Sequence, residues 1–303
     1  MARETLDQML KDGTKRIEWC DIFKGMAILL IVIAHVSGRF NDYVYQFHVA
    51  AFFFISGYTN KGQGSLFEAV VKKALTLLLP YYFLNLAGLA VIDVLEKLGI
   101  AGFICSGVYH FDLQWKIMEA LRLGGTNCEW FGATWYLVVM FWAACLFDIE
   151  IRFAKRNKAC LMLMSICLFL LSLSMDPSTW VQALKAQYYM ALGWLLKNVL
   201  KEGKLSWTIL KACIIAVIWV IMTNMGLCDT MNWPTFKFNG MADMIMPLFG
   251  ILILVYLSQA MAALGRIKKP LLYLGRNTMS VMCLHFLGFK PAYLVMTALG
   301  RMS

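Results

Sequence analysis

Apolar segments long enough to cross a lipid bilayer as helices recur along the whole of this 303-residue chain. A hydrocarbon core about 30 Å thick is crossed by a helix of about 20 residues, so apolar runs of roughly 17 to 25 residues are candidate spans. Hydrophobic residues make up 60% of the chain and charged residues 15%, whereas soluble domains carry about 25% charged residues. The sequence therefore predicts an all-α polytopic membrane protein, a bundle of about nine to ten transmembrane helices forming one domain, residues 1–303. The expected spans are 22–38, 43–60, 74–95, 133–150, 159–175, 179–197, 208–226, 243–262 and 271–289. The short segment from Pro291 to Gly300 is expected to continue the ninth helix through a kink at Pro291.

Basic residues in alternate loops predict the orientation of the bundle. The N-terminal segment, residues 1–20, and every second loop are rich in Lys and Arg, and the positive-inside rule places them in the cytosol. These residues are Lys11, Lys15, Arg16, Lys61, Lys72, Lys73, Arg152, Lys155, Arg156, Lys158, Lys197, Lys201, Lys204, Arg266, Lys268 and Lys269. The net charge of +10 follows from this topology. Because the basic residues are spread over all of these loops without a nucleic-acid motif, we expect no nucleic-acid partner.

The longest segment between spans runs from Glu96 to Trp130 and is expected on the outer side. Phe111, Trp115, Met118 and Arg122 recur in it at helical spacing, which predicts a short amphipathic helix at the membrane surface. Cys105 and Cys128 flank this helix, and an oxidising compartment would allow a disulfide between them. The nine cysteines show no metal-binding spacing such as Cys-x-x-Cys, and we expect no metal.

The first expected span carries ionisable residues on one face. Lys24 and His35 are separated by the apolar or small residues 25–34. At about 100° per residue, this separation ends about 20° beyond three full turns, so both side chains share a face, about 16 Å apart along the axis. Asp21 is placed to pair with Lys24. An ionisable group in hydrocarbon costs roughly 2.5 to 3.5 kcal/mol, so we interpret the pair as functional. The structural alternative is that Lys24 extends to the interface and His35 bonds a neighbouring carbonyl.

Two further segments place polar residues in apolar surroundings. His48 enters an apolar run that ends in Ser56 and a glycine, small residues that let helices approach closely; a packing motif with an interfacial His is the alternative interpretation. Near the C-terminus, Thr278 and His285 are seven residues apart and share a helix face. Asn277 or Thr278 would also serve as a helix N-cap, a purely structural role.

Four motifs follow one another along nearly the whole chain: Asp21-x-x-Lys24-Gly25 followed by His35, Phe47-His48 with Phe53-Phe54-Ile55-Ser56-Gly57-Tyr58, Trp135-Tyr136-Leu137, and Gly275-Arg276-Asn277 followed by Ser280 and His285. In this order they resemble the acyltransferase-3 family of integral-membrane O-acyltransferases, and most closely its fucose 4-O-acetylase-like branch. The family's signature is a basic residue, usually Arg, about ten residues before an essential His. Here Lys24 stands at the basic position and lacks the planar fork of Arg. Adjacent Lys72 and Lys73 stand where the family often has Arg-x-x-Arg.

The resemblance implies an enzyme of the bacterial cytoplasmic membrane that moves an acyl group, usually acetyl from acetyl-CoA, to a hydroxyl of a cell-surface carbohydrate or lipid-linked sugar. Such a reaction needs a base for the hydroxyl proton, and His is suited to that task near neutral pH. We expect His35 to be buried, neutral and catalytic, together with Asp21. The residues expected to attract the phosphates of CoA are Lys24, Lys72, Lys73 and Arg276. Those expected to bind the acceptor are His48, Ser56, Trp135, Asn277, Ser280 and His285.

Two other classes of protein are weighed against this interpretation. A transporter or flippase for a polysaccharide precursor would also line a path with polar residues, but transporters are often built from internal repeats, and none is detectable here. A membrane-embedded sensor or scaffold would have no use for a His that faces a Lys within one span. The handling of acyl-CoA discriminates among the three, since only the enzyme has to bind it.

Overall fold

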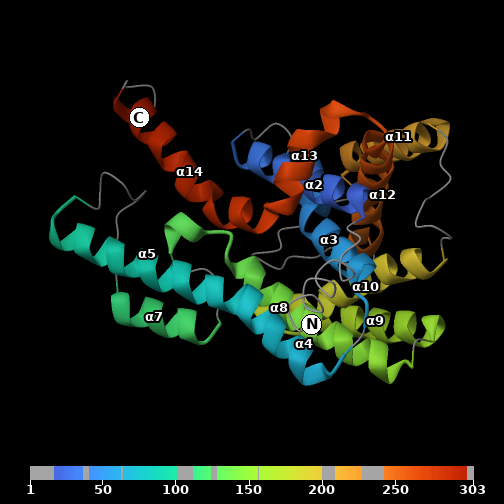
Figure 1. The fold of residues 1–303 in the computed structure, drawn as a ribbon, viewed down its shortest axis with the longest axis horizontal. Coiled ribbons are helices and arrows are strands. Elements are labelled where there is room, and N and C mark those ends of the chain that lie inside the picture. The colour runs from blue at the N-terminus through green and yellow to red at the C-terminus, as the bar shows by residue number, and fades with distance from the viewer. Residues whose placement is uncertain are drawn as a thin grey trace, which may run out of the picture.

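Within the residues that the computed structural model describes, every regular element is a helix (Figure 1). These residues are 17–36, 41–62, 64–100, 112–123, 128–155, 157–199, 209–226 and 242–298. The α-helices are α2 (Glu18–Val36), α3 (Asn41–Thr59), α4 (Leu66–Lys73), α5 (Leu79–Lys97), α7 (Leu113–Leu121), α8 (Trp135–Phe153), α9 (Lys158–Ser172), α10 (Thr179–Val199), α11 (Ile209–Asn224), α12 (Ala242–Ala262), α13 (Lys269–Arg276) and α14 (Thr278–Ala298). A π-helical turn, η2 (Ala74–Leu78), joins α4 to α5, and two short 3-10 turns are η3 (Glu129–Phe131) and η5 (Arg266–Lys268).

Among the described residues, three helical stretches are long and apolar enough to cross a membrane, namely Glu18–Val36, Leu66–Lys97 and Met244–Ala262. Lys158–Ser172 and Ile209–Asn224 are shorter apolar helices. Together they support the predicted all-helical integral membrane protein. The larger number of nine to ten spans stays a prediction.

The last predicted span is wrong, because it joins two separate helices. Residues 271–289 do not form one helix, because α13 ends at Arg276 and α14 begins at Thr278. Asn277, between them, has φ −107° and ψ 20°, and its side-chain amide donates to Tyr273 O at 2.8 Å. The amide therefore closes the end of α13. The continuation past Pro291 is confirmed, since α14 runs on to Ala298 with Pro291 inside it.

The amphipathic helix expected in the segment after α5 is present as α7. Asp112 caps its first turn by accepting from the backbone N–H of Trp115 at 3.0 Å, and Trp115 and Met118 are exposed on its surface. Phe111 and Cys105 lie outside the described residues, so the proposed disulfide is not tested.

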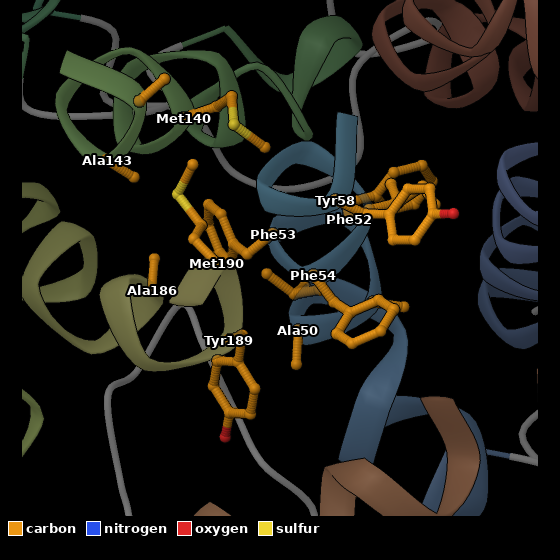
Figure 2. Packing of buried hydrophobic residues seen from close by; sticks show 14 of the residues in the cluster. Ala50, Phe52, Phe53, Phe54, Tyr58, Met140, Ala143, Ala186, Tyr189 and Met190 are labelled. Carbon is orange, nitrogen blue, oxygen red and sulfur yellow. The ribbon is translucent and has the colours of Figure 1, made fainter. Parts of the chain in front are cut away.

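The core of the bundle surrounds α3, which packs against α2, α8, α10 and α12. Figure 2 shows Phe53 of α3 among Met190 and Ala186 of α10 and Met140 of α8. The helices α3 and α10 come unusually close because glycines lie at the crossing. A Cβ on Gly57 would lie 2.0 Å from Met190 O, and one on Gly193 would lie 1.9 Å from Phe54 O. The small residues after His48 thus have the close-packing role that the sequence predicts.

Candidate functional site

The N-terminal end of α2 carries a charged cluster, which consists of Glu18, Asp21, Lys24, Lys268 and Arg276. Lys24 Nζ lies 2.9 Å from Asp21 Oδ1, so the expected pair is present. Arg276 Nε approaches the other carboxylate oxygen, Asp21 Oδ2, at 3.7 Å. Lys268 Nζ pairs with Glu18 Oε2 at 2.9 Å. Asp21 is 5% exposed, whereas the side chain of Arg276 is 52% exposed, so a buried carboxylate orders cations that remain accessible.

Two glycines explain how Arg276 reaches α2 from far along the chain. The helix α13 packs against α2 with Gly25 facing Leu271 and Gly275 facing Asp21. A Cβ on Gly25 would lie 2.1 Å from Leu271 O, and one on Gly275 would lie 1.7 Å from Asp21 O. Only glycine permits this approach at both positions. The motif residues beside Lys24 and Arg276 therefore set the distance between the two helices.

At the opposite end of α2, three histidines from three helices form an imidazole cluster, which consists of His35, His48 and His285. The ring centroids of His35 and His285 are 5.2 Å apart. Tyr45 joins His48 to them, with its ring 6.0 Å from that of His35 and 5.1 Å from that of His48. His48 of α3 and His285 of α14, both predicted to bind the acceptor, thus lie in one cluster with His35 of α2, the predicted base.

Each imidazole of the cluster is held in the same way by its own helix. His35 Nδ1 lies 2.8 Å from Ile31 O and His48 Nδ1 lies 2.9 Å from Val44 O. His285 Nδ1 lies 2.8 Å from Met282 O. A carbonyl oxygen only accepts hydrogen bonds, so the neutral rings carry their hydrogen on Nδ1 and leave Nε2 as an acceptor. This tautomer is the one that a general base needs.

Aromatic rings enclose one side of the imidazole cluster. Phe286 lies 4.9 Å from the ring of His35 and 4.4 Å from that of His285, and Phe289 lies 5.8 Å from His285. His285 is buried and His48 is half-buried. His35 is exposed, in the last turn of α2, so the expectation that it is buried is wrong. Its helix ends one residue later, at Val36, and among the described residues the His35 side of the cluster is the exposed one.

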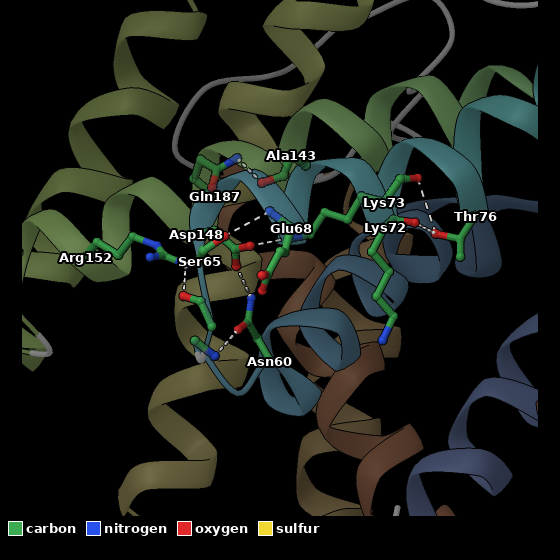
Figure 3. Close-up of polar contacts among 12 residues, drawn as sticks. Asn60, Ser65, Glu68, Lys72, Lys73, Thr76, Ala143, Asp148, Arg152 and Gln187 are labelled. Atoms are coloured by element: carbon green, nitrogen blue, oxygen red, sulfur yellow. Dashed lines mark hydrogen bonds and ion pairs between the residues drawn. The ribbon is translucent and has the colours of Figure 1, made fainter. Parts of the chain in front are cut away.

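Lys72 and Lys73, predicted as a pair of cations, point in different directions. Lys73 forms an ion pair with Asp148 of α8, and Asn60 donates to the same carboxylate at 2.9 Å (Figure 3). Lys72 is exposed and lines an open groove of about 390 Å³ beside Phe67. Successive residues of a helix lie about 100° apart, so adjacent lysines cannot present one patch.

The Lys73–Asp148 pair lies at the same end of the bundle as the charged cluster. Lys197 donates to Asn60 O at 2.9 Å and so ties α10 to the end of α3. Trp19 and Tyr58 pack with ring centroids 4.8 Å apart, which ties the beginning of α2 to the same end of α3. The predicted donor-site cations therefore share one end of the molecule, even though they do not form one patch.

The other predicted acceptor residues do not join the imidazole cluster. Ser56 is half-buried, eight residues beyond His48 on α3 and therefore about 12 Å further along the axis. Asn277 lies at the end of α13, beside the charged cluster. Ser280 is exposed near the beginning of α14. Trp135 is half-buried in the first turn of α8, where its ring lies 6.1 Å from that of Tyr136.

Several polar residues of the bundle were missed from the sequence. Asp148 and Glu150 are buried in α8, and Ser165 of α9 donates to Glu150 at 2.7 Å. Acidic residues inside a predicted span are a signal that could have identified both. Tyr45 and Phe289 were also missed, although they lie three residues before His48 and four after His285, on the same helix faces. In the described part of the chain, no group of three His, Cys, Asp or Glu residues is placed to hold a metal ion.

Comparison with known proteins identifies this arrangement at the level of the family. A family model described as an acyltransferase domain matches residues 17–301, which include α2 through α14 and both clusters. No curated protein and no solved structure matches the chain.

Proposed function

Because the chain belongs to the acyltransferase-3 family, we propose that it moves an acetyl group from acetyl-CoA to a hydroxyl of a cell-surface carbohydrate or lipid-linked sugar. The family makes it a membrane acyltransferase; the donor, the acceptor and the fucose 4-O-acetylase-like branch belong to the proposal. One observation carries it. The charged cluster and the imidazole cluster lie at opposite ends of the same helix, α2, with Lys24 and His35 about 16 Å apart along its axis.

The charged cluster supports a donor site for a molecule rich in phosphate. Three cations face two carboxylates, which leaves an excess of positive charge among the five side chains. Arg276 is the best placed of the three for a phosphate, because its planar guanidinium is half exposed and donates in a fork. Buried Asp21 holds Lys24 and Arg276 in position, so we assign it a positioning role at the donor end. Its distance from His35, about 21 Å along the helix, excludes a direct hydrogen bond with the base.

The imidazole cluster supports the proton transfer of the reaction. His35 Nε2 takes the proton of the acceptor hydroxyl while the hydroxyl oxygen forms a bond to the thioester carbonyl carbon. The C–S bond then breaks, and the thiolate leaving group takes the proton back from His35. The products are the acetyl ester and the free thiol of CoA, and His35 returns to its starting state. His48 and His285 line the acceptor side of the same cluster.

The two ends of α2 suggest how the reaction is divided between the two faces of the membrane. With the N-terminus in the cytosol, the charged cluster lies where acetyl-CoA is made, and the imidazole cluster lies toward the outer face of a bacterial cytoplasmic membrane. An acceptor that is presented from outside would meet the thioester at His35 without acetyl-CoA itself crossing.

Transfer of a labelled acetyl group tests the proposal directly. Purified full-length protein in detergent is incubated with acetyl-CoA labelled in its acetyl group and a panel of glycans and lipid-linked sugars. We expect one class of acceptor to become labelled, and His35→Ala to abolish that labelling while CoA still binds. A protein that moves a lipid-linked sugar across vesicles without binding acetyl-CoA would instead be the transporter or flippase considered above.

A further inference from the structure

One ring atom of the imidazole cluster, Nε2 of His285, has no hydrogen-bond partner among the described residues. His285 is 7% exposed, and its Nε2 is completely buried without a hydrogen bond. Its Nδ1 is already engaged by the carbonyls of Val281 and Met282, at 3.2 and 2.8 Å, so the ring is fixed by its own helix. Nε2 is therefore a fixed acceptor that lacks a donor. Buried polar atoms in proteins are nearly always hydrogen-bonded, so this acceptor is available to a donor group of a ligand.

The neighbour of His285 cannot supply that hydrogen bond. The ring of His35 lies 5.2 Å away, but its Nδ1 also faces a carbonyl, which leaves its Nε2 as an acceptor as well. Two acceptors do not bond each other. Within the described residues, therefore, no group donates to His285 Nε2, and a ligand that binds both atoms has to bring a donor to each.

We propose that His285 determines the specificity of the acceptor by binding a second hydroxyl, adjacent to the one that His35 deprotonates. This assignment rests on the proposed function of the imidazole cluster. The acceptor then carries neighbouring hydroxyls on one ring, with the reacting hydroxyl on His35 Nε2 and its neighbour donating to His285 Nε2. An alcohol with a single hydroxyl, bound to His35 through that hydroxyl, leaves the buried Nε2 of His285 unsatisfied.

The surroundings of the pair fit a ring with one polar edge. Phe286 packs against both His35 and His285, and Phe289 packs against His285 with its ring 6.3 Å from that of Phe286. Apolar walls with a few fixed polar groups are the usual construction of a small-molecule site, in which the polar groups determine the orientation of the ligand. His285 is the deeper of the two histidines and His35 the exposed one, so the second hydroxyl enters first and the reacting hydroxyl stays nearer the opening.

Two probes that differ by one hydroxyl test the assignment. Full-length protein in detergent is titrated with cis-1,2-cyclohexanediol and with cyclohexanol, and binding is followed by intrinsic tryptophan fluorescence. We expect the diol to bind about 10- to 100-fold more tightly than cyclohexanol. This is the loss of affinity expected when cyclohexanol leaves the buried Nε2 of His285 unpaired. Equal affinities for the two probes overturn the assignment, because Nε2 would then be satisfied by something other than the acceptor.

Two substitutions of the same residue separate recognition from packing. His285→Phe should reduce the ratio of the two affinities to about one, since phenylalanine fills the space without an acceptor. His285→Gln should retain part of the ratio, because its amide oxygen accepts a hydrogen bond. A His285→Phe protein that keeps the wild-type ratio overturns the assignment. If the His285→Phe variant does not fold, the ratio of the two affinities is compared between the wild type and His285→Gln. An unchanged ratio in His285→Gln then overturns the assignment.

Acetyl transfer to the same probes distinguishes the failure of this inference from that of the proposed function. Transfer to diol and mono-alcohol at equal rates overturns the role of His285 and leaves the acyltransferase intact. Discrimination in binding without any transfer from acetyl-CoA supports the role of His285 and overturns the proposed reaction.

Discussion

Gly275→Ala is expected to be strongly disruptive, although it adds only one methyl group. Alanine stabilises most helices relative to glycine by up to about 1 kcal/mol. At position 275, however, the new Cβ would lie 1.7 Å from Asp21 O and 2.6 Å from its carbonyl carbon. Ordinary contact begins at 3.4 Å, and the obstacle is the backbone of α2, which cannot rotate aside like a side chain. The helix α13 must therefore retreat from α2 by about 1.7 Å, and we expect overpacking of this kind to cost about 1 to 3 kcal/mol.

The same retreat should weaken the charged cluster. Arg276 follows Gly275 directly and already lies 3.7 Å from Asp21 Oδ2, so a further 1 to 2 Å, roughly the size of the retreat, takes it out of ion-pair range. We expect Gly275→Ala to lower both the midpoint of thermal unfolding and the affinity for CoA. Both are measured on detergent-purified protein, by differential scanning fluorimetry and by CoA titration.

Gly288→Ala is the matched control for this prediction. It makes the same change inside α14, where a new Cβ would meet nothing within 4 Å. We expect its unfolding midpoint to equal or exceed that of the wild type and its CoA affinity to be unchanged. If the free energies of unfolding of the Gly275→Ala and Gly288→Ala variants differ by less than about 0.5 kcal/mol, the close approach of α13 to α2 is wrong.

Three further predictions concern single side chains. His35→Ala should reduce acetyl transfer by about 10² to 10⁴-fold, the usual contribution of a general base, with CoA binding retained; a variant with more than about a tenth of the wild-type rate would exclude His35 as the base. Lys24→Ala should weaken CoA binding at low salt and less so at high salt, where the wild-type attraction is already screened, and an unchanged affinity in the titration would remove Lys24 from the donor site. Asp148→Asn should lower the free energy of unfolding by about 2 kcal/mol, because it leaves half-buried Lys73 without its charged partner. Asp93→Asn, which breaks the exposed pair of α5, should cost less than about 1 kcal/mol in the same denaturation experiment, and equal losses would contradict the importance of burial.

The polar face of α2 could be predicted from the sequence, because all of its residues belong to one regular helix. Helical periodicity alone places Asp21, Lys24 and His35, and the structure keeps all three in one unbroken helix. The same periodicity would have separated Lys72 from Lys73 by about 100°, and it would have placed Ser56 two turns away from His48. In both cases the motif positions were carried over without regard to helix geometry, and the binding roles of these residues stay predictions.

The convergence of helices could not be read from periodicity. Spacing places His285 on a face of its own helix, but which face meets His35 depends on the packing of α13 and α14. The apolar segment 271–289 also conceals the break at Asn277, because hydropathy averages over the polar residues at a helix end. The exposure of His35 depends on where α2 ends, and helix ends are among the least certain features of any sequence-based prediction.

The connection through Asn277 links the two clusters mechanically. The helix α13 is fixed against α2 at Gly25 and Gly275, which brings Arg276 to Asp21. Two residues after Arg276 α14 begins, and His285, seven residues after its first residue, reaches His35 near the far end of the same α2. Both the cation at the donor end and the imidazole at the acceptor end are therefore positioned by one short segment that rests on one helix. A displacement of α13 has to move Arg276 directly and His285 through the turn at Asn277, so donor binding and acceptor recognition should not vary independently when this contact is disturbed.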